Sequence, residues 1–276
     1  MARANFGVAR ASEFSTGRRF TQPSCASADT HHTTMSLARV SRPLPCPTPP
    51  SSPSNDAVLY VAMDEANPLE EARLRAKGVV VTTIRARNGH VVHYAGTHYE
   101  LATRPGIVRF VDALANDHGL RSKTARAIVD ILASQHENVR DELAGIAIVW
   151  ARAEAGAAIP SRLVLSGCAA DGAMHSDDGE LAFSAVAGLA AVLPRAAKQV
   201  EDIHFAGDGS AEQVVQADVW RRVFPNLRTL WAYDDGTANA TVEDLDLWAK
   251  ITTGRQANIG RVTHAMTWSV RCHPNG

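Results

Sequence analysis

The fold is decided by residues 162–172, which read "RLVLSGCAADG". The apolar letters "LVL" are typical of a buried β-strand, and they lead directly into the polar sequence "SGC". After a polar loop, "FSAVAGLAAVL" at 183–193 repeats its apolar residues with helical spacing, and "VEDIHFAG" at 200–207 predicts another strand. The order strand, helix, strand indicates a parallel βαβ unit.

The same alternation continues toward the C-terminus. A helix is predicted over 211–224, a strand over 227–233 and a further helix over 242–251. Because crossovers between parallel strands are right-handed, the three predicted strands are expected to be neighbours in one sheet.

A candidate site lies where these strands end. Ligands of open α/β sheets bind beyond the carboxyl ends of the strands. The loops that start at Ser166, Gly207 and Asp234 are therefore expected to line one cleft. The candidate lining residues are Ser166, Gly167, Asp208, Asp234 and Asp235.

The region before residue 104 predicts two more strands. "AVLYVAM" at 57–63 has the near-continuous apolar character of a strand buried on both faces. The Asn-Pro pair at 67–68 predicts the start of a helix, and "VVVTTIRA" at 79–86 predicts a second strand. The Asn-Gly pair at 88–89 is a type I′ turn signal, so this second strand is expected to form a hairpin with the residues that follow.

Three helices are predicted between these two regions, as a helical insertion. They cover 105–117, 123–135 and 138–156, and Ser122 is expected to cap the second. The apolar face of the third helix consists of Leu143, Ile146, Trp150 and Ala153. Such a stripe predicts core packing.

Residues 1–56 differ from the rest of the chain. They lack periodicity, and 41–56 is dense in proline and serine, so little apolar surface is present to offset the entropy of ordering. We expect a disordered tail followed by a single α/β domain over 57–276. Two alternatives are a start at Met35, with residues 1–34 absent from the native product, and an arginine-rich targeting peptide.

Composition narrows the classes of partner. The 28 lysines and arginines balance 29 acidic residues, which argues against nucleic-acid binding. No apolar run reaches the roughly 20 residues that span a bilayer, so no membrane association is expected. The four cysteines form no CxxC pair, which argues against a zinc module or a disulfide framework and favours a cytoplasmic location. The sequence predicts no oligomeric state.

The strand ends near 166 and 206 resemble the caspase-like fold of the clan CD cysteine peptidases. In that family one strand ends in Ser-Gly-His, and the next ends in a small residue followed by the nucleophilic cysteine. Here the corresponding residues are Ser166-Gly167-Cys168 and Ala206-Gly207. Both dyad positions, 168 and 207, are therefore substituted.

The resemblance extends to "FPNLRTLWAYDDG" at 224–236, which is similar to the following strand and its substrate-side loop. It implies a three-layer α/β/α sandwich with a mostly parallel central sheet. It also implies a former active-site cleft beyond the ends of the strands.

Loss of the dyad predicts a catalytically degenerate domain that binds a peptide or a protein partner in the former cleft. An alternative is an active cysteine hydrolase in which Cys168 pairs with His175, because a thiol needs a nearby base to act as a nucleophile. His204 is a weaker candidate base, since it lies within an apolar strand where a structural role is expected. A third interpretation is a structural scaffold in which Cys168 fills a small apolar position.

Neither a metal nor a cofactor is predicted. Residues 177–180, "DDGE", lack the spacing of a calcium loop and are expected to cap the helix that begins near Phe183. Residues 207–212, "GDGSAE", lack the lysine of a Walker phosphate loop.

Two further pairs have more than one interpretation. Asp234 and Asp235 could select a basic side chain by charge, although Asp-Asp-Gly is also an ordinary turn sequence. His31 and His32 lie in the tail, where solvated histidines are expected in preference to metal ligands.

Overall fold

A computed structural model describes the chain in seven stretches. The described residues are 57–63, 68–76, 78–85, 90–170, 172–175, 179–206 and 217–231. All of them belong to one compact unit. In these stretches no helix has both the length and the apolar character needed to cross a membrane. The predicted tail at 1–56 and the predicted helix at 242–251 lie outside the described residues.

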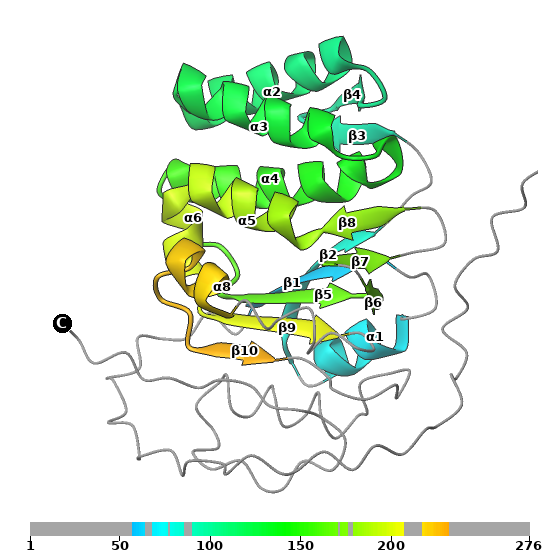
Figure 1. Ribbon diagram of the computed structural model, residues 1–276, viewed down its shortest axis with the longest axis vertical. Helices are drawn as coiled ribbons and strands as arrows, with labels where there is room; N and C mark the ends of the chain where they lie inside the picture. Colours follow the sequence, from blue (N-terminus) through cyan, green and yellow to red (C-terminus); the bar gives the residue numbers. More distant parts are fainter. Residues whose placement is uncertain are drawn as a thin grey trace, which may run out of the picture. The chain divides into compact units, whose positions relative to one another are not determined.

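The described elements are labelled in Figure 1. The strands are β1 (Ala57–Ala62), β2 (Val80–Arg85), β3 (Val91–Tyr94), β4 (Thr97–Glu100), β5 (Arg162–Ser166), β6 (Cys168–Ala170), β7 (Ala173–His175), β8 (Glu180–Ala182), β9 (Asp202–Ala206) and β10 (Thr229–Trp231). The helices are α1 (Pro68–Ala76), α2 (Arg104–His118), α3 (Ser122–Ser134), η1 (Glu137–Val139), α4 (Arg140–Glu154), α5 (Phe183–Val192), α6 (Pro194–Gln199) and α8 (Ala217–Val223).

The central sheet is parallel. Its strand order among the described residues is β10-β9-β5-β1-β2, and every neighbouring pair runs in the same direction. The predicted neighbours β5, β9 and β10 lie side by side, which confirms a mixed α/β fold with a mostly parallel sheet. From β1 the chain continues to β2 at one edge of the sheet, and from β5 it continues to β9 and β10 at the other edge. The direction of the strand order therefore reverses between β1 and β5.

Alternate residues of β1 face opposite sides of the sheet, and helices cover both sides. All six residues of β1 are buried, as predicted for a strand covered on both sides. Val58 and Tyr60 pack with Leu74 of α1 on one face. Leu59 and Val61 belong to the larger core on the other face, which α4 and α5 cover.

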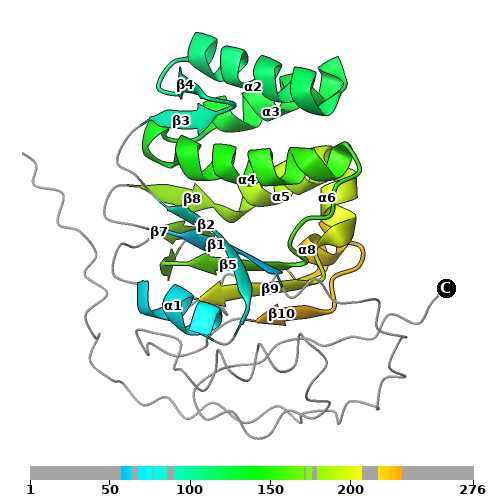
Figure 2. The ribbon, with the colours of Figure 1, turned by 180° about the vertical axis from the view of Figure 1, so that it is seen from behind.

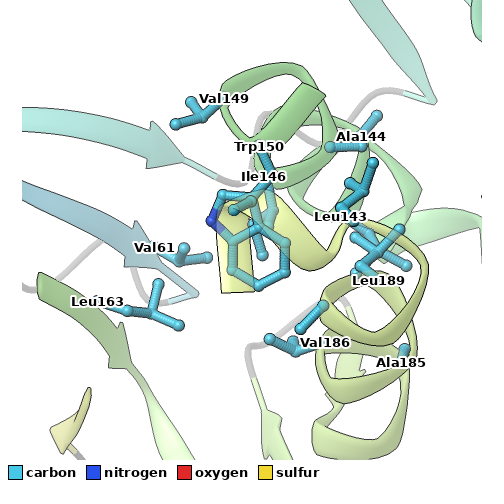
Figure 3. Packing of buried hydrophobic residues seen from close by; sticks show 14 of the residues in the cluster. Val61, Leu143, Ala144, Ile146, Val149, Trp150, Leu163, Ala185, Val186 and Leu189 are labelled. Carbon is cyan, nitrogen blue, oxygen red and sulfur yellow. The ribbon is translucent and has the colours of Figure 1, made fainter. Parts of the chain in front are cut away.

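Helix α4 supplies the centre of the larger core. The four residues of its predicted apolar face are at most 1% exposed, which confirms that prediction. Figure 3 shows Trp150 between the sheet and α5, with Val61 and Leu163 on one side and Val186 on the other. Removing a buried side chain of this size typically costs about 3–5 kcal/mol of the free energy of unfolding.

Helices α2 and α3 form an outer layer on α4 and α5, as the opposite views in Figures 1 and 2 both show. Thr103 begins α2 by accepting a hydrogen bond from the Gly106 N–H at 3.3 Å, and Gly119 ends it with a φ of 63°. The predicted Ser122 cap of α3 is wrong, because Ser122 is already the first helical residue and Arg121 occupies the cap position.

The predicted hairpin at residues 88–89 is also wrong. β2 pairs in parallel with β1, whereas β3 pairs with β4 in a separate antiparallel hairpin. The tight turn of this hairpin is formed by Ala95 and Gly96, whose φ angles of 49° and 77° are those of a type I′ turn. Parallel pairing of β2 with β1 takes the place of the expected antiparallel pairing of β2 with β3.

Candidate functional site

β5 and β9 end next to each other at the carboxyl edge of the sheet. Ser166 is the register partner of Ala206. The Met63 N–H donates to the Ser166 carbonyl at 2.8 Å, and the Gly167 N–H donates to the Ala206 carbonyl at 3.3 Å. The chain therefore leaves β5 between the ends of β1 and β9, beside the topological switch where open α/β sheets bind ligands.

The Ser-Gly step sets the path of the chain beyond β5. Ser166 is 0% exposed, so its side chain lies in the interior. A Cβ atom at Gly167 would lie 2.8 Å from the carbonyl oxygen of His175 and 3.0 Å from the Cβ of Met63. Only glycine allows β7 to cross the end of β5 this closely.

The segment after Gly167 is a small antiparallel sheet, β6-β7-β8, and not the polar loop that was predicted. Gly172, with a φ of 79°, lies in the β6–β7 turn. The Asp-Gly pair at 171–172, flanked by apolar residues, is a hairpin signal that could have revealed this turn.

Glu180 lies in β8, so its predicted role in capping α5 is wrong. The cap position of α5 is Ala182, which makes no side-chain cap hydrogen bond. Residues 180–182 pair with β7 as a strand, and α5 begins at the next residue, Phe183. No loop therefore precedes the helix in which an acidic side chain could act as its cap.

The register of the small sheet brings Cys168 and His175 together. Cys168 pairs with His175 across β6 and β7, and His175 pairs with Glu180 across β7 and β8. Directly opposed residues of an antiparallel pair lie on the same face, with Cα atoms about 4.5–5.5 Å apart. The three positions therefore form one row with the half-buried His175 in the middle.

This row contains the residue types of a thiol–imidazole pair. Cysteine is a nucleophile as its thiolate, and a neutral imidazole can accept the thiol proton. A carboxylate on the far side of an imidazole can orient the ring by accepting its other N–H. The exposed Glu180 occupies that far side of His175.

The structure does not place the remaining predicted site residues. Those outside the described residues are Gly207, Asp208, Asp234 and Asp235. That these residues line one cleft together with Cys168 stays a prediction, and so does the loop expected at residues 207–212, "GDGSAE".

His204 lies inside the sheet, away from the edge. It pairs in register with Val164 of β5 and Trp231 of β10 and is 0% exposed. Burial lowers the pKa of His204 to about 3, so the imidazole is neutral at physiological pH. A side chain closed off from solvent at this depth cannot exchange protons with a substrate at the carboxyl edge.

Glu142 of α4 is a buried acid that the sequence analysis did not identify. It is 0% exposed, and neither carboxyl oxygen has a hydrogen-bond partner among the described residues. Burial, followed by the neighbouring Asp141, raises the pKa of Glu142 to about 9. The side chain is therefore a neutral carboxylic acid at pH 7. Its spacing to Ile146 and Trp150, i, i+4 and i+8, was the signal that it faces the core.

The first turns of α4 lie toward the carboxyl edge of the sheet. A Cβ at Gly145 would contact Ile84, near the end of β2. A Cβ at Gly179 would contact Val139, just before α4, and Gly179 directly precedes β8. Glu142 lies between these two contact points, on the same side of the fold as the small sheet.

No protein-family model, curated protein or solved structure matches this chain.

Proposed function

We propose that this chain is a caspase-like domain that binds a peptide or an extended protein segment at the carboxyl edge of its parallel sheet, without the peptidase dyad of that family. The observation that carries the proposal is the register of Ser166 with Ala206 at the ends of two adjacent parallel strands. The resemblance requires this arrangement, because its two catalytic positions follow directly after such strand ends.

The location of the topological switch supports the same edge. β1 and β5 are neighbours, and the chain continues from them toward opposite edges of the sheet. The connections therefore diverge at this point, and such a switch is where open α/β sheets bind their ligands. The backbone at Gly167 and Met63, the residue directly after β1, lie beside this switch.

The residues at the two dyad positions argue for binding without cleavage. Gly207 stands where the family has its nucleophile, and a glycine has no side chain to attack a carbonyl. Cys168 stands where the family has its histidine, and a thiol is a poor general base toward a substrate amide.

The acidic residues predicted for this edge favour a basic ligand. Asp208, Asp234 and Asp235 follow the ends of β9 and β10 in the sequence. Carboxylates at a recognition site select lysine or arginine through charge-assisted hydrogen bonds. The proposed ligand is therefore an extended segment that carries at least one basic side chain.

Binding of fluorescent peptide libraries to the full chain tests the proposal. Lysine- or arginine-containing peptides are expected to bind, and an Asp234→Asn/Asp235→Asn variant should lose at least tenfold in affinity. The matched control is Asp112→Asn/Asp117→Asn, which removes two exposed acids from α2 in the outer layer. No measurable binding of any library, or equal losses in the two double variants, would exclude the proposed site.

A second candidate function is favoured by the register of Cys168 with His175. In this hypothesis the protein is a cysteine hydrolase with a displaced dyad. His175 accepts the thiol proton, and the Cys168 thiolate attacks a carbonyl carbon to form a thioester as the leaving group takes the proton from the imidazole. Water activated by the same imidazole then hydrolyses the thioester and releases the acid.

A further inference from the structure

The β3–β4 hairpin carries two histidines on its exposed face. His93 and His98 are direct register partners, and both are exposed. Their ring centroids are 3.8 Å apart, with an angle of 59° between the ring planes. This pair lies outside the candidate site at the carboxyl edge and has no part in the proposed peptide binding.

The turn determines why the two rings are so close. With a two-residue turn at Ala95 and Gly96, Tyr94 and Thr97 form the first hydrogen-bonded pair of the hairpin. The next pair, His93 with His98, is then a non-hydrogen-bonded pair, in which the Cα atoms are about 4.5 Å apart and the side chains are closest. The geometry follows from the backbone and not from a chance rotamer.

The other face of the hairpin holds this geometry in place. Val92 is 8% exposed, and Tyr94 and Tyr99 pack on Phe110 of α2 with ring centroids 6.1 and 5.9 Å away. The Tyr94 hydroxyl also lies 3.1 Å from the Nε2 of His118. The histidine face therefore points to solvent, and the backbone that carries it is already ordered before a ligand binds.

We propose that His93 and His98 form a bidentate imidazole site for a borderline divalent transition-metal ion such as Zn²⁺. Imidazole nitrogen is a preferred ligand of this class of ion, whereas Mg²⁺ and Ca²⁺ prefer oxygen. In a tetrahedral zinc complex, Zn–N bonds of about 2.0–2.1 Å place two nitrogens roughly 3.3 Å apart. Two rings 3.8 Å apart reach this spacing by side-chain rotation alone.

Water completes the coordination of this site. In the described ranges, no group of three or more His, Cys, Asp or Glu side chains is arranged to hold a metal. Glu100, two residues after His98, lies on the same face of the hairpin. Its Oε1 accepts a hydrogen bond from the Ala102 N–H at 3.3 Å. Its second carboxylate oxygen can accept a hydrogen bond from a metal-bound water.

Calorimetric titration of the full chain with ZnCl₂ tests the site, after the cysteines have been blocked with N-ethylmaleimide so that thiols do not compete. One binding event per chain is expected with Zn²⁺ and none with Mg²⁺. His93→Ala and His98→Ala should each weaken Zn²⁺ binding at least tenfold. The matched control His31→Ala/His32→Ala removes the adjacent pair of the tail and should bind as the wild type does.

Thermal melting separates a specific site from general loss of structure. Excess Zn²⁺ should raise the melting temperature of the wild type, because the unfolded chain does not hold the two rings together. The His93→Ala and His98→Ala variants should melt like the wild type without metal and show no rise with it. Zn²⁺ affinity that survives both substitutions, or that is lost only in the tail variant, would overturn the proposal.

Discussion

Cys168 and His175 are direct register partners across the β6–β7 hairpin, and this hairpin crosses the end of β5 at Gly167. Cys168 and His175 are seven residues apart in the sequence, yet they occupy opposed positions in the small sheet. Whether His175 activates the Cys168 thiol can be measured directly.

Alkylation of Cys168 is expected to depend on His175 if the displaced dyad operates. An unassisted thiol with a pKa near 8.5 reacts roughly a hundredfold more slowly at pH 6.5 than at high pH. A thiolate stabilised by an adjacent imidazole should lose less than tenfold over the same range, and His175→Ala should restore the larger loss. Peptide mapping by mass spectrometry measures the rate at each cysteine.

The other cysteines serve as internal references in that experiment. Cys25, Cys46 and Cys272 are expected to show the full pH dependence of unassisted thiols. If Cys168 follows the same dependence as these three, the second candidate function is excluded and the binding domain without catalysis stands alone.

Gly167→Ala is expected to destabilise the fold at the candidate site. The new methyl group would collide with the carbonyl of His175, a backbone atom that cannot rotate away. Displacing β7 should cost about 1–3 kcal/mol, measured as a decrease in the urea-derived free energy of unfolding.

Gly188→Ala in α5 is the matched substitution. Its Cβ would meet only the Cδ1 and Cγ1 of Ile131, at 3.4 and 3.7 Å. Alanine is preferred over glycine within a helix, so stability should rise by up to about 1 kcal/mol. Equal effects of the two substitutions would show that β7 does not lie against Gly167.

Glu142→Gln is expected to stabilise the protein at neutral and alkaline pH. The folded-state pKa of about 9 lies above the ordinary value of 4.5, so the unfolded chain ionises first as pH rises. Stability is therefore lost between pH 4.5 and about 9, at 1.36 kcal/mol per pH unit. The penalty at pH 7 is on the order of 3 kcal/mol, and glutamine, which is isosteric with the neutral acid, removes it.

Urea unfolding at pH 5, 7 and 8.5 measures this effect. The difference between Glu142→Gln and the wild type should increase with pH. A constant difference at the three pH values would mean that the Glu142 carboxyl is ionised in the folded protein.

His204 is expected to produce the opposite pH dependence. Its folded-state pKa of about 3 lies below the ordinary 6.5, so its contribution is complete above pH 6.5 and is lost as pH falls toward 3. Between pH 6.5 and 5 the free energy of unfolding should fall by about 2 kcal/mol.

A His204→Gln variant should lose this acid slope, whatever its absolute stability. The measured quantity is the change in unfolding free energy between pH 6.5 and 5, so a general destabilisation by the substitution does not disturb the comparison. An unchanged slope would mean that the pKa of His204 is the same in the folded and the unfolded protein, so that burial does not lower it.

Elements defined by strong apolar patterns could be predicted from the sequence. The strands β1, β5 and β9 each contain a short apolar run, and all of their residues are buried. The stripe on α4 has the same origin, since helical periodicity reports directly which side faces the core. These predictions succeeded because burial of apolar surface is the dominant driving force and leaves a local record in the sequence.

Elements determined by pairing could not be predicted in this way. The Asn-Gly signal at 88–89 predicted a hairpin, yet β2 pairs with β1 and the turn forms at Ala95 and Gly96. The three short strands between Gly167 and Phe183 contain few residues each, so periodicity is too brief to reveal them. Register depends on contacts between distant segments, which no local window contains.

The sequence by itself determined the class of fold, the parallel order of β5, β9 and β10, and the residues that fill the core. Only the tertiary structure decided that Cys168 pairs in register with His175, that His93 faces His98 and that Glu142 is a buried neutral acid. The physical reason is that apolar patterning is a property of each segment alone. The environment of a polar side chain is set by the register and packing of segments that meet only when the chain has folded.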